Sequence, residues 1–387
     1  MLLTLFFNHA AVSDDKIKIG LLVPLSGQYS DIGKSVVNSV RLALNSINNN
    51  RLEIIPRDTK SDPIETLSAA EDLFNNKNIQ IMIGPVFYNS TRFLDQLPNV
   101  TFLAFTNILE NKHSNVISSG VNSISQINAI KKFQSIKGLE NSIFLIPNSI
   151  YKSEIEKAIL KTKIRIKNKY TYDTDPTLLT SQIEKITKYP QRKQNLIDEI
   201  KRVEDSNEVN KDNILEKLKR RDTIGRINFD SVIIADFDEN LKSVTTSLLY
   251  TDVNSERVSY ISLNQWFDES LLKERALQPI YFPSIDKKNY DSFINTYKKN
   301  YKNDPNQISF LSYDLVGLVY HLIYKNNFEI DKKIFYDKSR FKGKIGIFEI
   351  DKNTITHKLS FYSVDNGQFK KIFWFFWMPS FYDRFFF

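Results

Sequence analysis

Cysteine is absent from this chain of 387 residues. Its absence excludes disulfides, thiolate metal sites, cysteine nucleophiles and a lipid-modified cysteine. Glycine is also scarce, with 11 residues. Hydrophobic residues make up 41% and charged residues 25%, which is the balance of a globular protein. A chain of this length exceeds one ordinary core, so we expect two lobes.

Histidine, the commonest catalytic and metal-binding side chain, occurs four times, at His9, His113, His321 and His357. None of the four is followed three or four residues later by a second zinc ligand. The Gly-x-Ser-x-Gly elbow of serine hydrolases does not occur. We therefore predict no metal site, no cofactor and no enzymatic activity.

One glycine-containing loop invites a nucleotide-binding interpretation. Gly27, Gly33, Lys34 and Ser35 lie between a predicted strand and a predicted helix, where a phosphate-binding loop would be. That motif needs four residues between its glycines, and here five intervene. The spacing argues against nucleotide hydrolysis. The net charge of +8 is spread along the chain, so we expect no nucleic-acid partner.

Apolar segments of strand length alternate with amphipathic segments of helix length from Lys16 onward. The first run predicts strands at 16–23, 51–57, 79–83 and 101–105, and helices at 34–47 and 63–75. The second run predicts helices at 125–136, 151–160, 176–189 and 241–250, and strands at 142–146, 164–172, 231–235, 258–263 and 280–283. Helices at 290–300 and 309–324 then precede an antiparallel pair, 344–350 with 358–364. Strands buried by helices on both faces form parallel sheets, so we predict an α/β protein with two doubly wound, Rossmann-like lobes.

The two runs also predict where the chain divides. Lobe 1 comprises 14–119 and 285–344, and lobe 2 comprises 120–284 and 345–371, with three crossovers near Gly120, Ser284 and Lys344. Residues 190–226 interrupt lobe 2 with ten basic and eight acidic residues, and predict a charged helical hairpin. Two interpretations stay open for this hairpin: a solvated insertion with one docked face, or an arm that binds a partner.

The two ends of the chain carry apolar segments of unassigned role. Residues 1–13 form a candidate signal segment, because Ala11, Val12 and Ser13 are small enough for a signal peptidase, although the apolar run before them is short. The alternative is a loosely held N-terminus. Residues 372–387 form an aromatic tail that is too short to span a bilayer as a helix. Docking on the core, a membrane interface and a reading-frame artefact all remain open for the tail.

Small and polar residues follow the predicted strands at the points where the strands end. In doubly wound sheets, ligands lie beyond the carboxyl ends of the strands, where hydroxyls and backbone N–H groups suit a carboxylate. Two such edges, one from each lobe, would form a cleft. The alternative is that these residues are only turn and cap residues. The candidate ligand-binding residues are Ser26, Gly27, Gly84, Pro85, Val86, Phe87, Thr106, Asn107, Tyr151, Asp236 and Trp266.

The order of several short motifs resembles the type I periplasmic binding proteins of the leucine-binding kind. KIGLLVPLSGQYSDIGKSVVNSVRLAL resembles their opening strand, loop and helix, and IMIGPVF (Ile81–Phe87) their third strand and its loop. SYDLVGLV (Ser312–Val319) resembles a late helix, and FKGKIGIFEID (Phe341–Asp351) the closing hairpin. The chain departs from this pattern in two places. Tyr151 is followed by Lys152 where these relatives usually have glycine, and the fourth strand is followed by Thr106-Asn107 where they commonly have Ser or Thr with another small residue.

A narrower resemblance is to the proteobacterial penicillin-binding protein activators, a branch of the same superfamily. It rests on RLEIIPRDTKSDP (Arg51–Pro63), KRRDTIGRINFDSVIIADF (Lys219–Phe237) and SLNQWFD (Ser262–Asp268), and that branch has a similar charged insertion. The absence of a lipidation cysteine is a departure from it.

The broad resemblance implies a periplasmic protein that binds an amino acid or small carboxylate for an ABC permease. There, Ser26, Gly84–Phe87 and Thr106 would hold the carboxylate, and Tyr151 and Trp266 would close over the ligand. The narrower resemblance implies instead a regulator of a peptidoglycan synthase that acts through protein–protein contact.

Overall fold

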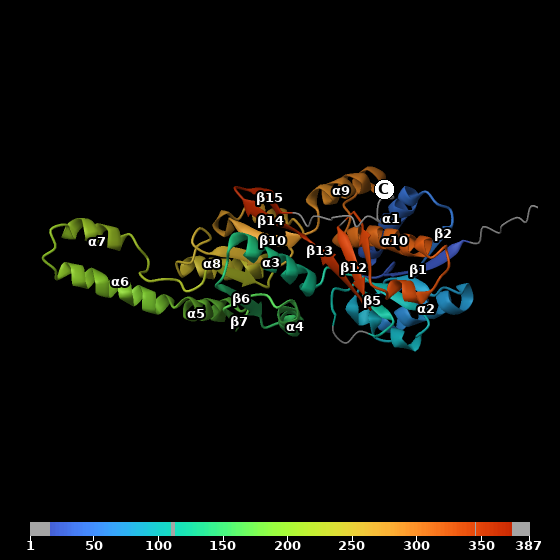
Figure 1. Ribbon diagram of the computed structural model, residues 1–387, viewed down its shortest axis with the longest axis horizontal. Helices are drawn as coiled ribbons and strands as arrows, with labels where there is room; N and C mark the ends of the chain where they lie inside the picture. Colours follow the sequence, from blue (N-terminus) through green and yellow to red (C-terminus); the bar gives the residue numbers. More distant parts are fainter. Residues whose placement is uncertain (1–15, 110–112, 345, 374–387) are drawn as a thin grey trace, which may run out of the picture. The chain divides into compact units, whose positions relative to one another are not determined.

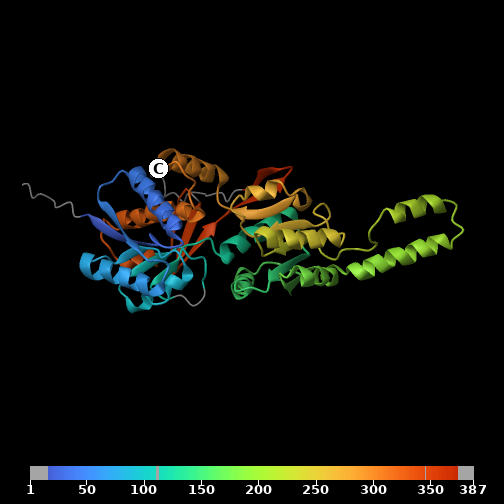
Figure 2. The same cartoon turned by 180° about the vertical axis from the view of Figure 1, so that it is seen from behind.

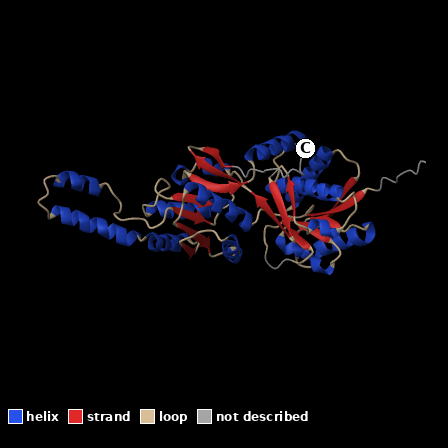
Figure 3. Ribbon diagram, in the orientation of Figure 1, coloured by secondary structure: helices blue, strands red, loops and turns tan. Residues whose placement is uncertain are grey.

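The computed structural model describes residues 16–109, 113–344 and 346–373. The chain divides into two compact units, Met1–Gly120 with Asp291–Ile355 and Val121–Tyr290 with Thr356–Phe387. The candidate signal segment 1–13 and residues 374–387 of the aromatic tail lie outside the described residues. Each unit has its own sheet with helices against it (Figures 1 and 3).

The sheet of unit 1 is parallel at its centre. Its strands follow the order β11-β12-β13-β5-β4-β3-β1-β2. Their bounds are β1 Ile17–Val23, β2 Leu52–Asp58, β3 Ile81–Ile83, β4 Thr101–Ala104, β5 Val116–Ser118, β11 Ser339–Lys342, β12 Ile347–Asp351 and β13 Thr354–Lys358. The helices of this unit are α1 Ser30–Ile47, α2 Pro63–Lys77 and α10 Gln307–Lys325, and α9 Lys287–Tyr301 begins in unit 2 and continues into unit 1. Short 3-10 helices lie at Tyr88–Thr91, Leu94–Gln96 and Lys332–Phe335.

The centre of unit 1 forms where the sequence is apolar without interruption. Leu22, Met82, Phe102 and Ala104 on three neighbouring strands are fully buried together with Leu73 of α2. A side chain that is removed completely from water stabilises the fold by about 1.5–3 kcal/mol, so such strands belong at the centre of a sheet. Helix α2 begins where the sequence predicts, because the carboxylate of Asp62 accepts hydrogen bonds from two backbone N–H groups of its first turn.

Unit 2 repeats the arrangement with different strands. Its sheet follows the order β15-β14-β10-β9-β8-β6-β7. The strands are β6 Ser142–Pro147, β7 Asn168–Tyr172, β8 Ser231–Ile234, β9 Ser259–Ser262, β10 Ile280–Ser284, β14 Ser360–Asp365 and β15 Gln368–Phe373. The helices are α3 Ser123–Lys137, α4 Lys152–Thr162, α5 Pro176–Thr187 and α8 Asp238–Tyr250, with 3-10 turns at Glu269–Leu272 and Arg275–Leu277. The predicted α/β class with two doubly wound lobes is confirmed.

The charged insertion of unit 2 consists of α6 Tyr189–Glu204 and α7 Lys211–Lys219, which lie side by side in both views (Figures 1 and 2). Leu196, Val203 and Leu218 are buried between the two helices and form a core of their own. Helices α5 and α6 are separate, although the sequence predicts one helix over 176–189. Lys188 between them has φ +54°, a left-handed conformation that ends α5 and turns the chain into α6.

The end of the chain differs from the prediction. Residues 344–350 and 358–364 do not pair with each other: β12 pairs with β11 in unit 1, whereas β14 pairs with β10 and β15 in unit 2. The crossings between units lie at 120/121, 290/291 and 355/356, where the sequence placed the second and third near Ser284 and Lys344. The third crossing lies later than predicted because the hairpin of β11 and β12 extends the sheet of unit 1.

Candidate functional site

The carboxyl edge of each sheet is the edge at which its parallel strands end. In unit 1, β1 lies between β2 and β3. The chain therefore runs from β1 to β2 on one side of it and then crosses to β3 on the other side. This is a topological switch point, where the loops that follow two neighbouring strands diverge. The loops after β1 and β3 are joined across it by Tyr29 and Phe87, whose ring centroids lie 4.8 Å apart.

The hydroxyl of Ser26, a predicted carboxylate-binding group, is already bonded to a carboxylate of this chain. Ser26 Oγ lies 2.5 Å from Oδ2 of Asp58, the last residue of β2. Oδ1 of Asp58 accepts hydrogen bonds from the backbone N–H groups of Leu25, Ser26 and Lys60. Burial raises the pKa of Asp58, but these four hydrogen bonds outweigh it and hold the pKa below its ordinary value. The loop after β1 therefore binds an internal anion.

Two glycines of this edge are required by close backbone contacts. A Cβ on Gly33 would lie 1.7 Å from the carbonyl oxygen of Pro24, so α1 packs against the loop after β1 at a distance that only glycine permits. Gly84 has φ +107°, and a Cβ there would lie 2.2 Å from the carbonyl oxygen of Leu22. Gly27 has φ +75° and lies in open space. The close contact accounts for Gly33, and the positive φ accounts for Gly27, without a phosphate.

The loop after β3 and the loop after β4 hold polar groups with unused hydrogen-bonding capacity. Pro85, which follows Gly84 in a cis peptide, accepts a hydrogen bond from Phe105 N at 3.0 Å, so the two loops are joined. Within the described part of the chain, the N–H groups of Val86 and Phe87 have no hydrogen-bond acceptor. Thr106 is 6% exposed.

Two hydroxyls accompany those N–H groups. Thr106 Oγ1 accepts a hydrogen bond from Ile108 N, which leaves its own proton to donate. Ser90 Oγ, just beyond Phe87, is buried and has no partner among the described residues. Asn107, the other predicted residue of this loop, is exposed. Two N–H groups and two hydroxyls at neighbouring strand ends are suited to a carboxylate.

The carboxyl edge of unit 2 has a second switch point, because β6 lies between β7 and β8. Asp236, directly after β8, is 6% exposed and accepts a hydrogen bond of 2.7 Å from the hydroxyl of Tyr172 at the end of β7. Burial raises the pKa of Tyr172, and the charge of Asp236 raises it further. The other carboxylate oxygen of Asp236 accepts a hydrogen bond from Phe237 N.

Apolar side chains follow the ends of the strands in this unit. Ile150 and Tyr151 after β6 and Phe237 after β8 are exposed. Trp266 is half-buried after β9. The structure thus places Tyr151, Asp236 and Trp266, the predicted residues of this lobe, on the ends of β6, β8 and β9. The remaining predicted residues lie on unit 1.

The backbone at Trp266 is strained and held in place. Trp266 and Phe267 both have positive φ, +48° and +60°, a conformation that non-glycine residues adopt rarely. The ring of Phe267 is buried against Phe282, Tyr362 and other aromatic rings, and this packing fixes the loop.

Asn264, two residues before Trp266, was not predicted. Its Oδ1 accepts hydrogen bonds from Trp266 N and Ser284 Oγ, but its buried Nδ2 has no partner among the described residues. Asp58, Tyr29 and Tyr172 were also missed. The signal for Asp58 was its place at the end of β2, directly beside the loop after β1.

The residues of the glycine loop that would bind phosphate and magnesium contact other side chains of the protein instead. Lys34 is exposed and lies 3.5 Å from Asp31. Ser35 is buried and lies 2.6 Å from Ser309 Oγ of α10. A pocket of about 510 Å³ at the start of α1 and α10 is lined by both residues together with Asp31, Asp304 and Asn306.

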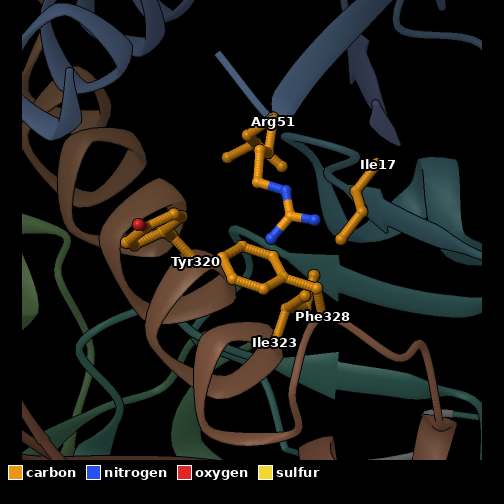
Figure 4. A pocket seen from close by; sticks show the side chains of 6 residues that line it. Ile17, Arg51, Tyr320, Ile323 and Phe328 are labelled. Atoms are coloured by element: carbon orange, nitrogen blue, oxygen red, sulfur yellow. The ribbon is translucent and has the colours of Figure 1, made fainter. Parts of the chain in front are cut away.

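A second pocket lies at the opposite edge of this sheet, where β1 and β2 begin (Figure 4). The guanidinium of Arg51 lies 4.3 Å from the ring centroid of Phe328. The lining is completed by Ile17, Leu52, Tyr320 and Ile323. The space has no room for a water molecule, so it is part of the packing. Across the described residues, no cluster of three or more metal-ligating side chains is found. None of the described helices has the length and apolar character needed to cross a membrane.

Comparison with known proteins agrees with this geometry. A family model described as periplasmic binding protein matches residues 16–162. No curated protein matches this sequence significantly. Solved structures match over most of the chain at low sequence identity, so they show the fold alone.

Three of these structures illustrate the range. A putative branched-chain amino acid ABC transporter protein from Rhodospirillum rubrum has a TM-score of 0.69 at 14% identity, covering 92% of this chain and 100% of that one. The C-domain of LpoA from Haemophilus influenzae, a regulator of PBP1A, has a TM-score of 0.62 at 13% identity, with coverage of 92% and 100%. LivJ from Streptococcus pneumoniae, solved with isoleucine, has a TM-score of 0.52 at 17% identity, with coverage of 92% and 98%. The chain therefore has the fold of the leucine-binding-protein-like type I periplasmic binding proteins, as its motifs predicted.

Proposed function

We propose that this protein is a non-catalytic, periplasmic solute-binding protein that takes an amino acid or small carboxylate and delivers it to an ABC permease. The observation that carries the proposal is the set of unpaired donors in unit 1: the N–H groups of Val86 and Phe87 and the hydroxyl of Thr106. A carboxylate bound there would receive charge-assisted hydrogen bonds, which are about twice as strong as neutral ones.

The internal carboxylate of Asp58 limits where the carboxylate of a ligand can bind in unit 1. Because Asp58 already uses Ser26 and the N–H groups of the loop after β1, the ligand's carboxylate belongs on the loops after β3 and β4. The exposed ring of Tyr29 and the half-buried ring of Phe87 favour a ligand with an apolar or aromatic body. Structural relatives solved with isoleucine and with hydroxybenzoates bind compounds of both kinds.

Thermal-shift screening tests this proposal. Branched-chain amino acids and hydroxybenzoates are added at millimolar concentration, and a ligand present at about 100 times its Kd stabilises the folded state by about 2.7 kcal/mol. Thr106→Val is expected to abolish the shift, Thr106→Ser to retain it, and Thr296→Val, a surface change on α9, to leave it unaltered. If none of these compounds raises the Tm of the wild-type protein, the proposal is wrong.

A second candidate function is regulation of a peptidoglycan synthase by direct contact. It is supported by the likeness to the LpoA C-domain and by the α6–α7 hairpin, which has its own core and is therefore more than an extended loop. The test is stimulation of a purified bifunctional peptidoglycan synthase from the same organism. Deleting 190–226 separates the hairpin's contribution from that of the lobes, and a protein that neither binds nor stimulates the synthase would contradict this candidate.

A further inference from the structure

The root of the α6–α7 hairpin is fixed to unit 2 by a buried arginine. Arg192 is 3% exposed, and its guanidinium donates hydrogen bonds to the carbonyl of Thr187 at 3.0 Å, to Thr223 Oγ1 at 2.9 Å and to the carbonyl of Thr251. Burial lowers the pKa of Arg192, and Asp252, 3.8 Å from the guanidinium, opposes that shift. Burying a guanidinium costs free energy unless all its donors are bonded. A solvated insertion does not need such an anchor.

The anchor joins two elements that are far apart in sequence into one surface. The ring of Tyr189, at the start of α6, lies 5.5 Å from the ring of Tyr250 at the end of α8. The ammonium of Lys193 lies 5.7 Å from the centre of the Tyr189 ring. Ile197, one turn further along the same stripe of α6, is 51% exposed. Leu249 and Tyr250 are also exposed, so apolar surface continues from α8 onto α6.

Cations without ion-pair partners border this apolar surface. The segment after α7 runs beside the first turns of α6, because Ile224 N donates to the carbonyl of Arg192 at 3.0 Å. That segment has the exposed Arg221 and Arg226, and Lys188 and Lys193 lie on the neighbouring helix start. In the described part of the chain none of these four side chains makes an ion pair. Further along the hairpin, in contrast, Arg202, Lys219 and Arg220 are paired with glutamates.

We propose that this hairpin root, defined by Lys188, Lys193, Ile197, Arg221, Arg226, Leu249 and Tyr250, is a docking surface for an acidic segment of a partner protein that carries an apolar or aromatic anchor. Tyrosine and arginine are enriched in binding hot spots, and the exposed Ile197 and Leu249 add apolar surface beside them. The surplus of positive charge selects an acidic partner and steers its approach. Because Arg192 fixes the hairpin in advance, the partner does not have to order this surface on binding.

The partner follows from the second candidate function, on which this inference rests: it is the peptidoglycan synthase. The experiment measures binding of the full-length chain to the purified bifunctional synthase of the same organism by biolayer interferometry. We expect Tyr250→Ala to raise the Kd about thirtyfold, the size of a hot-spot truncation. The triple variant Lys193→Glu, Arg221→Glu, Arg226→Glu should raise it at least as much, and the wild-type affinity should fall as salt rises.

Matched controls lie on unit 1. Tyr324→Ala removes a tyrosine of similar exposure, 52% against 56% for Tyr250. Lys299→Glu, Lys325→Glu, Lys338→Glu makes the same change in net charge at exposed sites of that unit. Both control variants should bind like the wild type.

The outcomes separate the two proposals. Wild-type binding that the root variants weaken and the controls do not supports the docking surface. If the synthase binds the wild type and both root variants equally, the docking surface is wrong and the regulator function stands. If the wild type does not bind the synthase, both are wrong.

Discussion

At the scale of single residues, the most informative side chain is Asp58. The sequence predicts that Ser26 and its neighbours hold the carboxylate of a ligand, and in the structure they hold the carboxylate of Asp58. A second anion beside it would be repelled by the first, since two unit charges 4 Å apart interact by about 4 kcal/mol at an effective dielectric constant of 20. The ligand proposal therefore moves to Val86, Phe87 and Thr106, which no internal acid occupies.

Asp58→Asn tests the role of this internal carboxylate. Its lowered pKa means that the ionised form stabilises the folded state above the ordinary carboxylate pKa, and that this stabilisation is lost as the pH falls through the lowered value. Urea unfolding should show Asp58→Asn destabilised by about 1–2 kcal/mol at pH 7. The difference from wild type should shrink at pH 3 and below.

The control for this comparison is Asp337→Asn, which changes an exposed carboxylate on the same unit. It should change the free energy of unfolding by less than about 0.5 kcal/mol at either pH. A gap between Asp58→Asn and wild type that stays constant from pH 7 to below pH 3 would show that the carboxylate charge is not the source of the stabilisation.

At the scale of elements, the sequence predicts what depends on local pattern and misses what depends on distant partners. β1, α2, β6 and β8 are continuous apolar or amphipathic segments, and each lies within a few residues of its predicted bounds. β5 has only three residues, too few for a periodic signal. The strand pairing at the end of the chain was wrong because β12 has its partner in β11, a segment whose alternation is interrupted by charges.

The candidate site also has a part that the sequence predicts and a part that it misses. Strand order and the carboxyl-edge rule locate the loops that hold the candidate residues. They do not show that Asp58 bonds to Ser26, 32 residues away in sequence, or that Asn264 keeps an unpaired amide. Such hydrogen bonds depend on side-chain conformations that no spacing in the sequence fixes.

A prediction about the helices α6 and α7 concerns Arg192, because this side chain fixes the hairpin to the rest of unit 2. Arg192→Met removes the donors of three hydrogen bonds and leaves buried oxygens of Thr187, Thr223 and Thr251 without them. We expect a loss of about 3 kcal/mol in the free energy of unfolding and faster amide hydrogen exchange in α6 and α7.

Arg202→Met provides the comparison, because Arg202 lies on the same helix and its side chain is 58% exposed. Its ion pairs with Glu199 and Glu208 lie in solvent, where such pairs add little to the free energy of unfolding. The anchoring role would be contradicted if the two variants lost equal free energy of unfolding. It would also be contradicted if amide hydrogen exchange in α6 and α7 stayed unchanged in Arg192→Met.

At the scale of the whole molecule, the fold and the function are separate questions. Relatives with this fold include proteins solved with isoleucine and with hydroxybenzoates and a regulator of PBP1A, all at 17% identity or less. One architecture therefore accommodates both of the functions proposed for this chain, and the choice depends on the surface residues of each unit.

The chain order of the units makes a last prediction about folding. Unit 1 is completed only by a segment that follows unit 2 in sequence, because α10 packs against α1. Ser39 Oγ donates to the carbonyl of Ser309 at 2.5 Å, and Asn49 Nδ2 donates to Tyr320 Oη at 2.9 Å. A fragment of residues 16–120 leaves the buried face of α1 exposed, including Val36 and Val40. We expect this fragment to lack cooperative thermal unfolding and a dispersed NMR spectrum.

Residues 16–120 joined through a flexible glycine–serine linker to residues 287–358 should instead fold cooperatively, since this fusion restores α9, α10 and strands β11 to β13. Its near-ultraviolet circular dichroism should show packed aromatic rings, because Phe293 and Phe310 lie 4.6 Å apart within the restored segment. The fusion should be more stable than the fragment because α10 covers apolar surface on α1 and on the sheet. This burial stabilises the fold by about 25 cal/mol for each Å² removed from water. A cooperatively folded 16–120 fragment would show that α10 is dispensable to unit 1, and an unfolded fusion would show that unit 1 depends on unit 2 for its stability.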